Sequence, residues 1–153
     1  MNEIEFIVDQ LQRAYDGEAW HGPSLTQALS GVNATTAAAR PLPQAHSIWQ
    51  LVLHIANWNE VFVKRSNGQA LQLSPEEDFP NVTDTSEAAW KAALEKLKKS
   101  HMDLQDLAAR SDPGFLERRV PGKDYNFRFM LHGMVQHEAY HAGQISILKK
   151  PAK

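Results

Sequence analysis

The amphipathic stretch from about Asn126 to Lys149 constrains the fold of this chain more than any other feature. At about 100° per residue, its apolar side chains fall within about 60° of Met134 and form one stripe along a helix. These side chains belong to Phe127, Met130, Leu131, Ile145 and Leu148. The spacing predicts a long helix with one face buried against other elements.

Three polar residues interrupt this apolar stripe. His137 and His141 are one turn apart and roughly 40° apart around the axis, and Glu138 points inward on the other side of Met134. Burying two imidazoles and a carboxylate carries a large desolvation cost unless they find partners. Two explanations stay open: each histidine bonds a backbone carbonyl in the core, or the i, i+4 pair presents two ring nitrogens to a divalent ion. His132 projects to the far side of the helix.

The same spacing predicts three further long helices. The first has roughly 15 residues and ends near Gly17, the second covers residues 47–66, and the third runs from a predicted capping box at Asp84 and Glu87 to about Arg110. A short helical turn, capped by Ser24, follows the first helix.

The remaining segments are predicted to connect these helices. Residues 31–45 and 69–82 are rich in small or polar residues and proline, which indicates loops, the second one exposed. Residues 115–120 are predicted to be briefly extended before the last helix. Four long helices and one short helix, with little strand, predict an all-α fold: an antiparallel four-helix bundle in a single domain over residues 1–153.

Two histidines on the other helices are ambiguous by spacing alone. His54 lies at the edge of its stripe, about 40° from Trp58, and is equally compatible with a structural and a functional role. His101 occupies a stripe position toward its helix end, which favours a core-edge residue. The chain has no cysteine, so any metal must be held by His, Asp or Glu.

Charge and N-terminal sequence exclude several classes of function. The net charge is −2, and no basic stripe with interleaved aromatic residues indicates nucleic-acid binding. No predicted segment resembles a signal peptide or a membrane span, so we expect a cytoplasmic protein that binds neither nucleic acid nor membrane.

Two motifs together resemble a known family. The run His-Ser-Ile-Trp-Gln-Leu-Val-Leu-His-Ile-Ala-Asn-Trp at residues 46–58 and the run His-Glu-Ala-Tyr-His-Ala-Gly-Gln-Ile at residues 137–145 resemble the DinB/YfiT-like superfamily of metal-binding helical bundles. The segments 20–24 and 120–125 fit the same pattern, so the resemblance covers nearly the whole chain.

The resemblance implies a ligand set and a type of chemistry. It assigns His54, His137 and His141 as ligands of a divalent ion, nickel or zinc, and leaves His46 and His132 as non-ligands. It also implies a substrate cleft at one end of the bundle, for which Trp20 and His21 are candidate walls. Members of the family include transferases and isomerases that use low-molecular-weight thiols such as bacillithiol or mycothiol, and others are described as metal-dependent hydrolases. A homodimer is expected on the same ground.

Three hypotheses follow for the function. The leading one is a metal-dependent enzyme of the thiol S-transferase type that acts on a small electrophile, with Glu138 either accepting a proton or orienting a histidine. A zinc peptidase is a rival, because residues 137–141 match the H-E-x-x-H pattern, although no His, Asp or Glu follows as a further ligand. The other rival is a non-catalytic bundle that binds metal or assembles with a partner.

Overall fold

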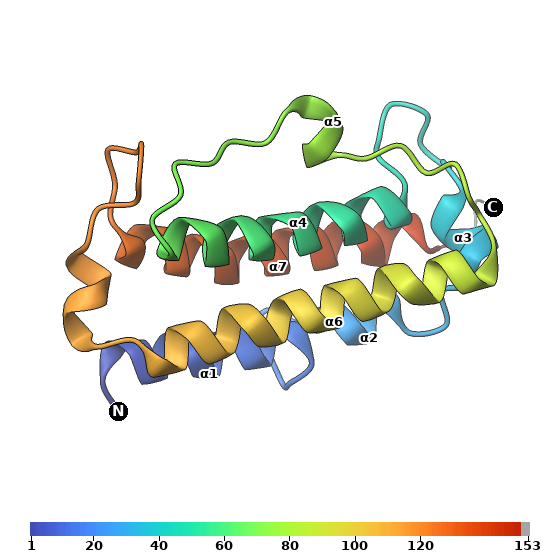
Figure 1. Cartoon of the computed structure of the whole chain (residues 1–153). Coiled ribbons are helices and arrows are strands. Elements are labelled where there is room, and N and C mark those ends of the chain that lie inside the picture. The colour runs from blue at the N-terminus through green and yellow to red at the C-terminus, as the bar shows by residue number, and fades with distance from the viewer. Residues whose placement is uncertain (151–153) are drawn as a thin grey trace.

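The computed structural model describes residues 1–150, most of which are helical (Figure 1). The long helices are α1 (Glu3–Tyr15), α4 (Ile48–Ser66), α6 (Glu87–Arg110) and α7 (Phe127–Leu148). The connections contain α2 (Leu25–Leu29), α3 (Ala34–Ala38), α5 (Pro75–Asp78) and the 3-10 helix η1 (Pro113–Glu117). The predicted all-α bundle, with a short helix after the first long one, is confirmed. None of the helices in residues 1–150 is long and apolar enough to cross a membrane.

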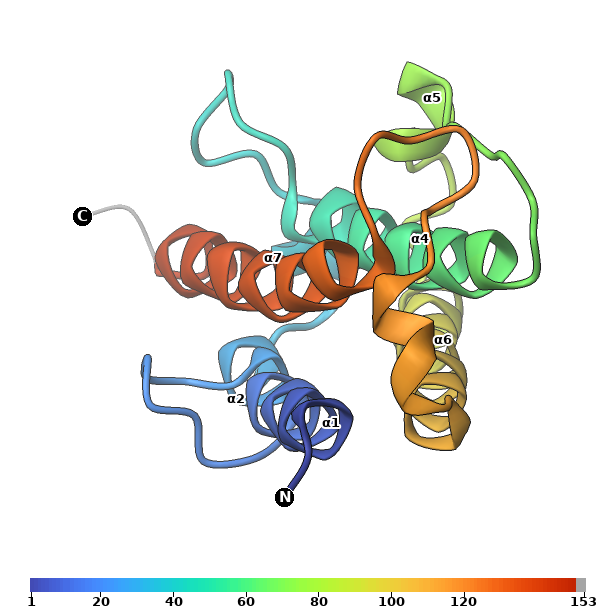
Figure 2. The same cartoon turned by 90° about the vertical axis from the view of Figure 1, so that its left-hand side faces the viewer.

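The four long helices pack in two layers, α4 with α7 and α6 with α1 (Figures 1 and 2). Antiparallel pairing holds for α4 with α7 and for α1 with α6. In contrast, α4 and α6 run in the same direction, because the connection between them travels back along the length of the bundle and carries α5 (Figure 1). This crossover brings α5 over the face of α4.

The helix starts follow local capping chemistry. Ser24 and Ser47 form capping boxes with Gln27 and Gln50, as their positions in the sequence suggest. The capping box predicted at Asp84 and Glu87 was wrong, since Ser86 caps α6 by accepting the Ala89 N–H at 3.1 Å.

The Glu87 carboxylate accepts the backbone N–H of Ala34 at 2.8 Å and so joins the start of α6 to α3. The loop predicted over residues 31–45 therefore contains a helical turn. Asn33 caps this turn, and Ala34 and Ala37 are buried. The extended segment predicted over residues 115–120 was wrong for its first half, because Pro113 starts a 3-10 turn that ends at Glu117 and buries Phe115. Its second half is extended, and Arg119 forms an antiparallel bridge with Asn126.

The core consists of two apolar clusters with a polar layer between them. One cluster surrounds Trp49 and Trp90, and the other surrounds Phe62 and Phe127. On each of α4, α6 and α7, buried polar side chains lie between residues of the two clusters. These are His54 and Asn59, Ser100 and His101, and Glu138 and His141. Buried polar groups need partners inside the protein, so this layer is where the bundle places its chemistry.

Candidate metal centre

Two helices bring three histidines together at this polar layer. His54 comes from α4, and His137 and His141 come from successive turns of α7. The Nε2 atom of His137 lies 2.9 Å from Nε2 of His54 and 3.0 Å from Nε2 of His141. One ring nitrogen from each histidine lies within 4.8 Å of a ring nitrogen of each of the other two. The three residues that the sequence resemblance singled out therefore converge on one point.

Hydrogen bonds on the outer side of two rings decide which nitrogen carries the proton. Nδ1 of His54 lies 2.9 Å from the Asp78 carboxylate and 3.0 Å from the Asp78 carbonyl, and both groups only accept. Nδ1 of His141 lies 2.5 Å from the side-chain oxygen of Gln144. Both histidines therefore donate from Nδ1 and turn the Nε2 lone pair toward His137. A neutral His137 has at most one N–H to share between these two acceptors, and its buried Nδ1 has no partner within residues 1–150, whereas a divalent cation accepts a lone pair from each ring, so the donor set fits a metal ion.

Burial keeps these imidazoles in the form that binds a metal. Desolvation, with smaller contributions from the neighbouring histidines, lowers the pKa of His137 to about 3. Desolvation likewise lowers the pKa of His141 to about 4. The pKa of His54 is also lowered by burial, and the Asp78 hydrogen bonds oppose that shift. All three rings are neutral at pH 7, as metal coordination requires.

Asp78 is a site residue that the sequence prediction missed, because residues 69–82 were expected to form an exposed loop. Its carboxylate accepts the indole N–H of Trp58 at 2.7 Å as well as the Nδ1–H of His54 at 2.9 Å. Ser74 and Glu77 form a capping box that starts α5 and sets Asp78 at its end. That box is readable in the sequence and would have predicted the turn, but only the crossover places the turn against α4.

Glu138 faces the other way, toward α6. It is fully buried, and its carboxylate lies 3.0 Å from Nδ1 of His101. Desolvation raises the pKa of Glu138, and the His101 interaction opposes that shift. Tyr15 of α1 stacks on the His101 ring at 3.9 Å between centroids. Glu138 was predicted either to accept a proton at the metal or to orient a histidine. In the structure its carboxylate contacts His101, and this Glu138–His101 pair joins α7 to α6 and α1.

The remaining predicted residues lie outside the triad. Trp20 is fully exposed and lies beside Asp9 and Arg13, and His21 is exposed with its ring 3.3 Å from the Pro23 carbonyl. Neither lines the cavity next to the histidines, because the segment between α1 and α2 projects into solvent. His46 and His132, which were expected to be non-ligands, stay outside the group: His46 stacks on Phe79, and His132 pairs with Glu3.

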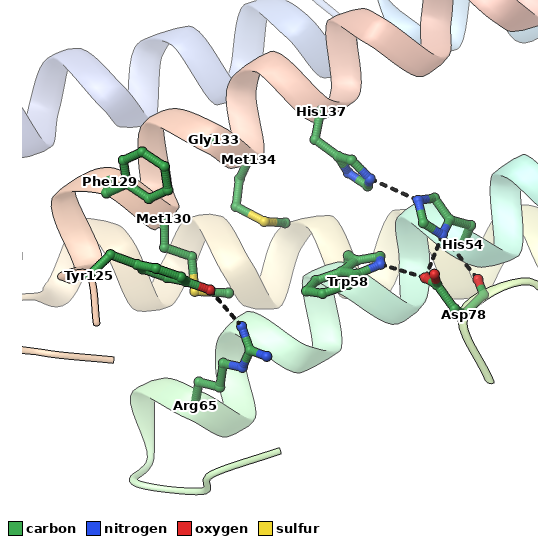
Figure 3. Close-up of a pocket in the computed structure, with 10 residues that line it drawn as sticks. All are labelled: His54, Trp58, Arg65, Asp78, Tyr125, Phe129, Met130, Gly133, Met134 and His137. Carbon is green, nitrogen blue, oxygen red and sulfur yellow. Dashed lines mark hydrogen bonds and ion pairs between the residues drawn. The ribbon is translucent and has the colours of Figure 1, made fainter. Parts of the chain in front are cut away.

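A cavity of about 320 Å³ opens beside the triad (Figure 3). His54 and His137 lie at one end of it, and Trp58 of α4 and Met134 of α7 form its middle walls. Its volume suits a small molecule rather than a polypeptide.

A family model provides the comparison that identifies the chain. The model described as the DinB superfamily matches residues 19–145, which is most of the sequence. The chain belongs to the DinB superfamily. Searches among curated proteins and among solved structures find no match. For this DinB protein, the individual residue roles therefore rest on the geometry of its own site.

The Asp78 carboxylate is expected to strengthen metal binding by this DinB protein through His54. Replacing Asp78 with asparagine removes the charge that holds the Nδ1 proton of His54, and we expect zinc affinity to fall about 10- to 100-fold. Competition against a chromogenic chelator measures this change. Glu76→Gln, on the same short helix but with no contact to a histidine, is the matched control. Unchanged affinity in Asp78→Asn would show that the carboxylate does not support the site.

The lowered histidine pKa values predict an acid-sensitive metal-free protein. Below pH 6.5 the unfolded chain takes up protons on these rings, whereas the folded protein takes them up only near pH 3 for His137 and near pH 4 for His141. The free energy of unfolding therefore falls as the pH decreases, by about 2 kcal/mol for each of these two rings between pH 7 and pH 5. Urea unfolding at both pH values measures the loss. The loss should be smaller by about 2 kcal/mol in His137→Gln, and an identical loss in that variant would contradict the prediction.

Proposed function

We propose that this DinB-superfamily protein is a metal-dependent enzyme that transfers a low-molecular-weight thiol to a small electrophile. The observation that carries the proposal is a set of three neutral imidazoles at the end of a cavity, with no fourth ligand in the group among residues 1–150. Structural zinc sites are commonly closed by four protein ligands, whereas catalytic sites use three and leave a position for a reactant.

The surrounding residues prepare this site for a reactant. A divalent ion held by the triad would act as a Lewis acid that lowers the pKa of a thiol or a water molecule bound to it. Asp78 and Gln144 hold the rings of His54 and His141 in the orientation that turns Nε2 inward. Trp58 and Met134 line the middle of the cavity next to the histidines, and their apolar surfaces limit the water around a bound reactant.

The shortage of a free general base favours thiol transfer over hydrolysis. Asp78 is the carboxylate that lines the cavity, and it already accepts hydrogen bonds from Trp58 and His54. A thiol has an ordinary pKa near 8.5, far below that of water, so it needs much less help to ionise at neutral pH. In the proposed reaction the sulfur forms a bond to the electrophilic carbon, the leaving group departs with its electron pair, and the thiol proton passes to solvent.

The buried position of Glu138 counts against a zinc peptidase. In an H-E-x-x-H peptidase the glutamate acts as the general base at the metal site. Here Glu138 is bonded to His101 of α6 and does not line the cavity, and residues 1–150 contain only isolated bridges in place of strands. A peptide substrate therefore finds neither the base nor a sheet edge.

The experiment that tests the proposal compares zinc- and nickel-loaded protein with metal-free protein. Cysteine, glutathione, bacillithiol and mycothiol are each reacted with monobromobimane, and formation of the fluorescent thioether is followed. We expect one metal equivalent per chain and a metal-dependent rate increase that is lost in His54→Ala and kept in His132→Ala, a half-buried histidine outside the triad. If the protein binds one metal equivalent but accelerates no reaction of these thiols with a wider set of electrophiles, the proposal is wrong. The alternative, a non-catalytic metal-binding bundle, would then stand.

A further inference from the structure

We infer that the cavity binds a substrate with a carboxylate group, which is held at the end opposite the histidines by Arg65 and Tyr125. The inference relies on the proposed function only for the reacting end of that substrate. Arg65 comes from the last turn of α4, and Tyr125 immediately precedes Asn126, the N-cap of α7 (Figure 3). Both residues line the cavity.

Arg65 is a buried cation without an acidic partner. Only 2% of its surface is exposed, and it forms no salt bridge within residues 1–150. Its Nε and Nη2 atoms donate to the Leu71 carbonyl at 3.1 and 2.8 Å, and Nη1 donates to the Tyr125 hydroxyl at 3.2 Å. A buried charge is costly when only neutral groups surround it, so an anion at this position gains more than it would in water.

The hydrogen-bonding capacity at this end is not filled. A guanidinium has five N–H donors, and the Arg65 contacts use three of them. Because the Tyr125 hydroxyl accepts from Arg65, its own proton remains available to a further acceptor. Acceptor oxygens alone satisfy such a set of donors, and a carboxylate presents two of them in the plane that arginine matches.

The bonds to Leu71 also have a structural role, since they hold the segment after α4 against the helix. That role accounts for Nε and Nη2 but leaves Nη1 directed to Tyr125 at the cavity wall (Figure 3). A neutral hydrogen-bond donor would be enough to hold the Leu71 carbonyl, so this contact does not require the positive charge of Arg65. The buried positive charge at the cavity is therefore the observation that the clamp does not explain.

The wall between the two ends indicates an apolar segment in the substrate. The indole of Trp58 has its centroid 5.6 Å from the Arg65 guanidinium carbon and 6.4 Å from the His137 ring centroid. Met130, Met134 and Phe129 complete the wall between the ends. Asp78 lies at the histidine end, where its negative charge disfavours a carboxylate. The best fit is an acid whose reacting atom is separated from the carboxylate by a flat or flexible apolar segment of roughly the length of an aromatic ring.

A matched pair of probes tests this inference without turnover. Isothermal titration calorimetry of the full-length protein, with its metal content measured, compares 3-phenylpropionate with 3-phenylpropan-1-ol at 0.15 M salt. We expect the acid to bind at least about tenfold more tightly, the difference that a charge-assisted pair provides. The preference should disappear in Arg65→Gln, shrink severalfold in Tyr125→Phe, and persist in the exposed control Arg118→Gln.

Three results would overturn the inference: no binding of the acid at millimolar concentration, equal affinity for acid and alcohol, or an acid preference that survives in both variants. The last result would place the carboxylate at the histidine end. Tyr125→Phe removes one hydroxyl and leaves the Leu71 clamp intact, so it decides the matter if Arg65→Gln fails to fold. An acid preference in a protein without thiol chemistry would remove the proposed transferase and keep the carboxylate site.

Discussion

Replacing His137 with alanine is expected to abolish metal binding, with zinc affinity lowered by at least about a thousandfold. Loss of an outer hydrogen-bond partner costs about 10- to 100-fold, and loss of a direct ligand costs more. His137 is the central member of the triad, because its Nε2 lies within 3.0 Å of the Nε2 atoms of both His54 and His141. Without His137, the ion would have only two imidazole ligands, one from α4 and one from α7, and two ligands are too few to hold it tightly.

Elemental analysis and competition against a chelating dye measure this change in untagged protein. His132→Ala, on the same helix but outside the triad, should keep full metal content and serves as the control. His137 is half-buried and its polar contacts are with the two other histidines, so the metal-free variant should remain folded. One equivalent of tightly bound metal in folded His137→Ala would show that the ion is held elsewhere.

Replacing Glu138 with alanine is expected to lower the free energy of unfolding by about 1–3 kcal/mol, the usual cost of leaving a buried polar group without its hydrogen-bond partner. Glu138 is completely buried and His101 is 1% exposed, so water does not compensate the group left behind. The change also leaves a cavity between α6 and α7, which adds to the cost. Urea unfolding of the metal-free protein measures the loss.

A double-mutant cycle separates the pair from the packing around it. Glu138→Leu combined with His101→Leu removes both polar partners, so the double variant should cost less than the sum of the two single changes. Glu138→Gln keeps the size and one acceptor, and it should remain folded with its metal content and thiol activity unchanged. Additive costs in the cycle would show that the two side chains do not stabilise each other. Loss of activity in folded, metal-loaded Glu138→Gln would restore the catalytic role that the sequence suggested.

Comparing the predicted and observed positions of individual residues shows which features the local sequence pattern is enough to predict. Apolar spacing alone predicts the long helices and turns His137 and His141 to one face of α7, because residues one turn apart share a face in any α-helix. The short helices α3 and α5 were missed, since each depends on a cap and on contacts with a distant helix. The capping residue of α6 was misassigned for a related reason: Glu87 bonds α3 rather than its own helix.

The sequence by itself determined the all-α class, the helix-forming segments and the inward position of the histidine pair, because these depend on spacing within one helix. Family resemblance added His54 as the third ligand. The tertiary structure alone decided that Asp78 supports His54, that Glu138 turns to His101, and that Arg65 and Tyr125 share a cavity with the triad. Each of these contacts joins residues 20 or more positions apart. Their meeting depends on the crossover that sets α4 parallel to α6, a choice that no local periodicity encodes.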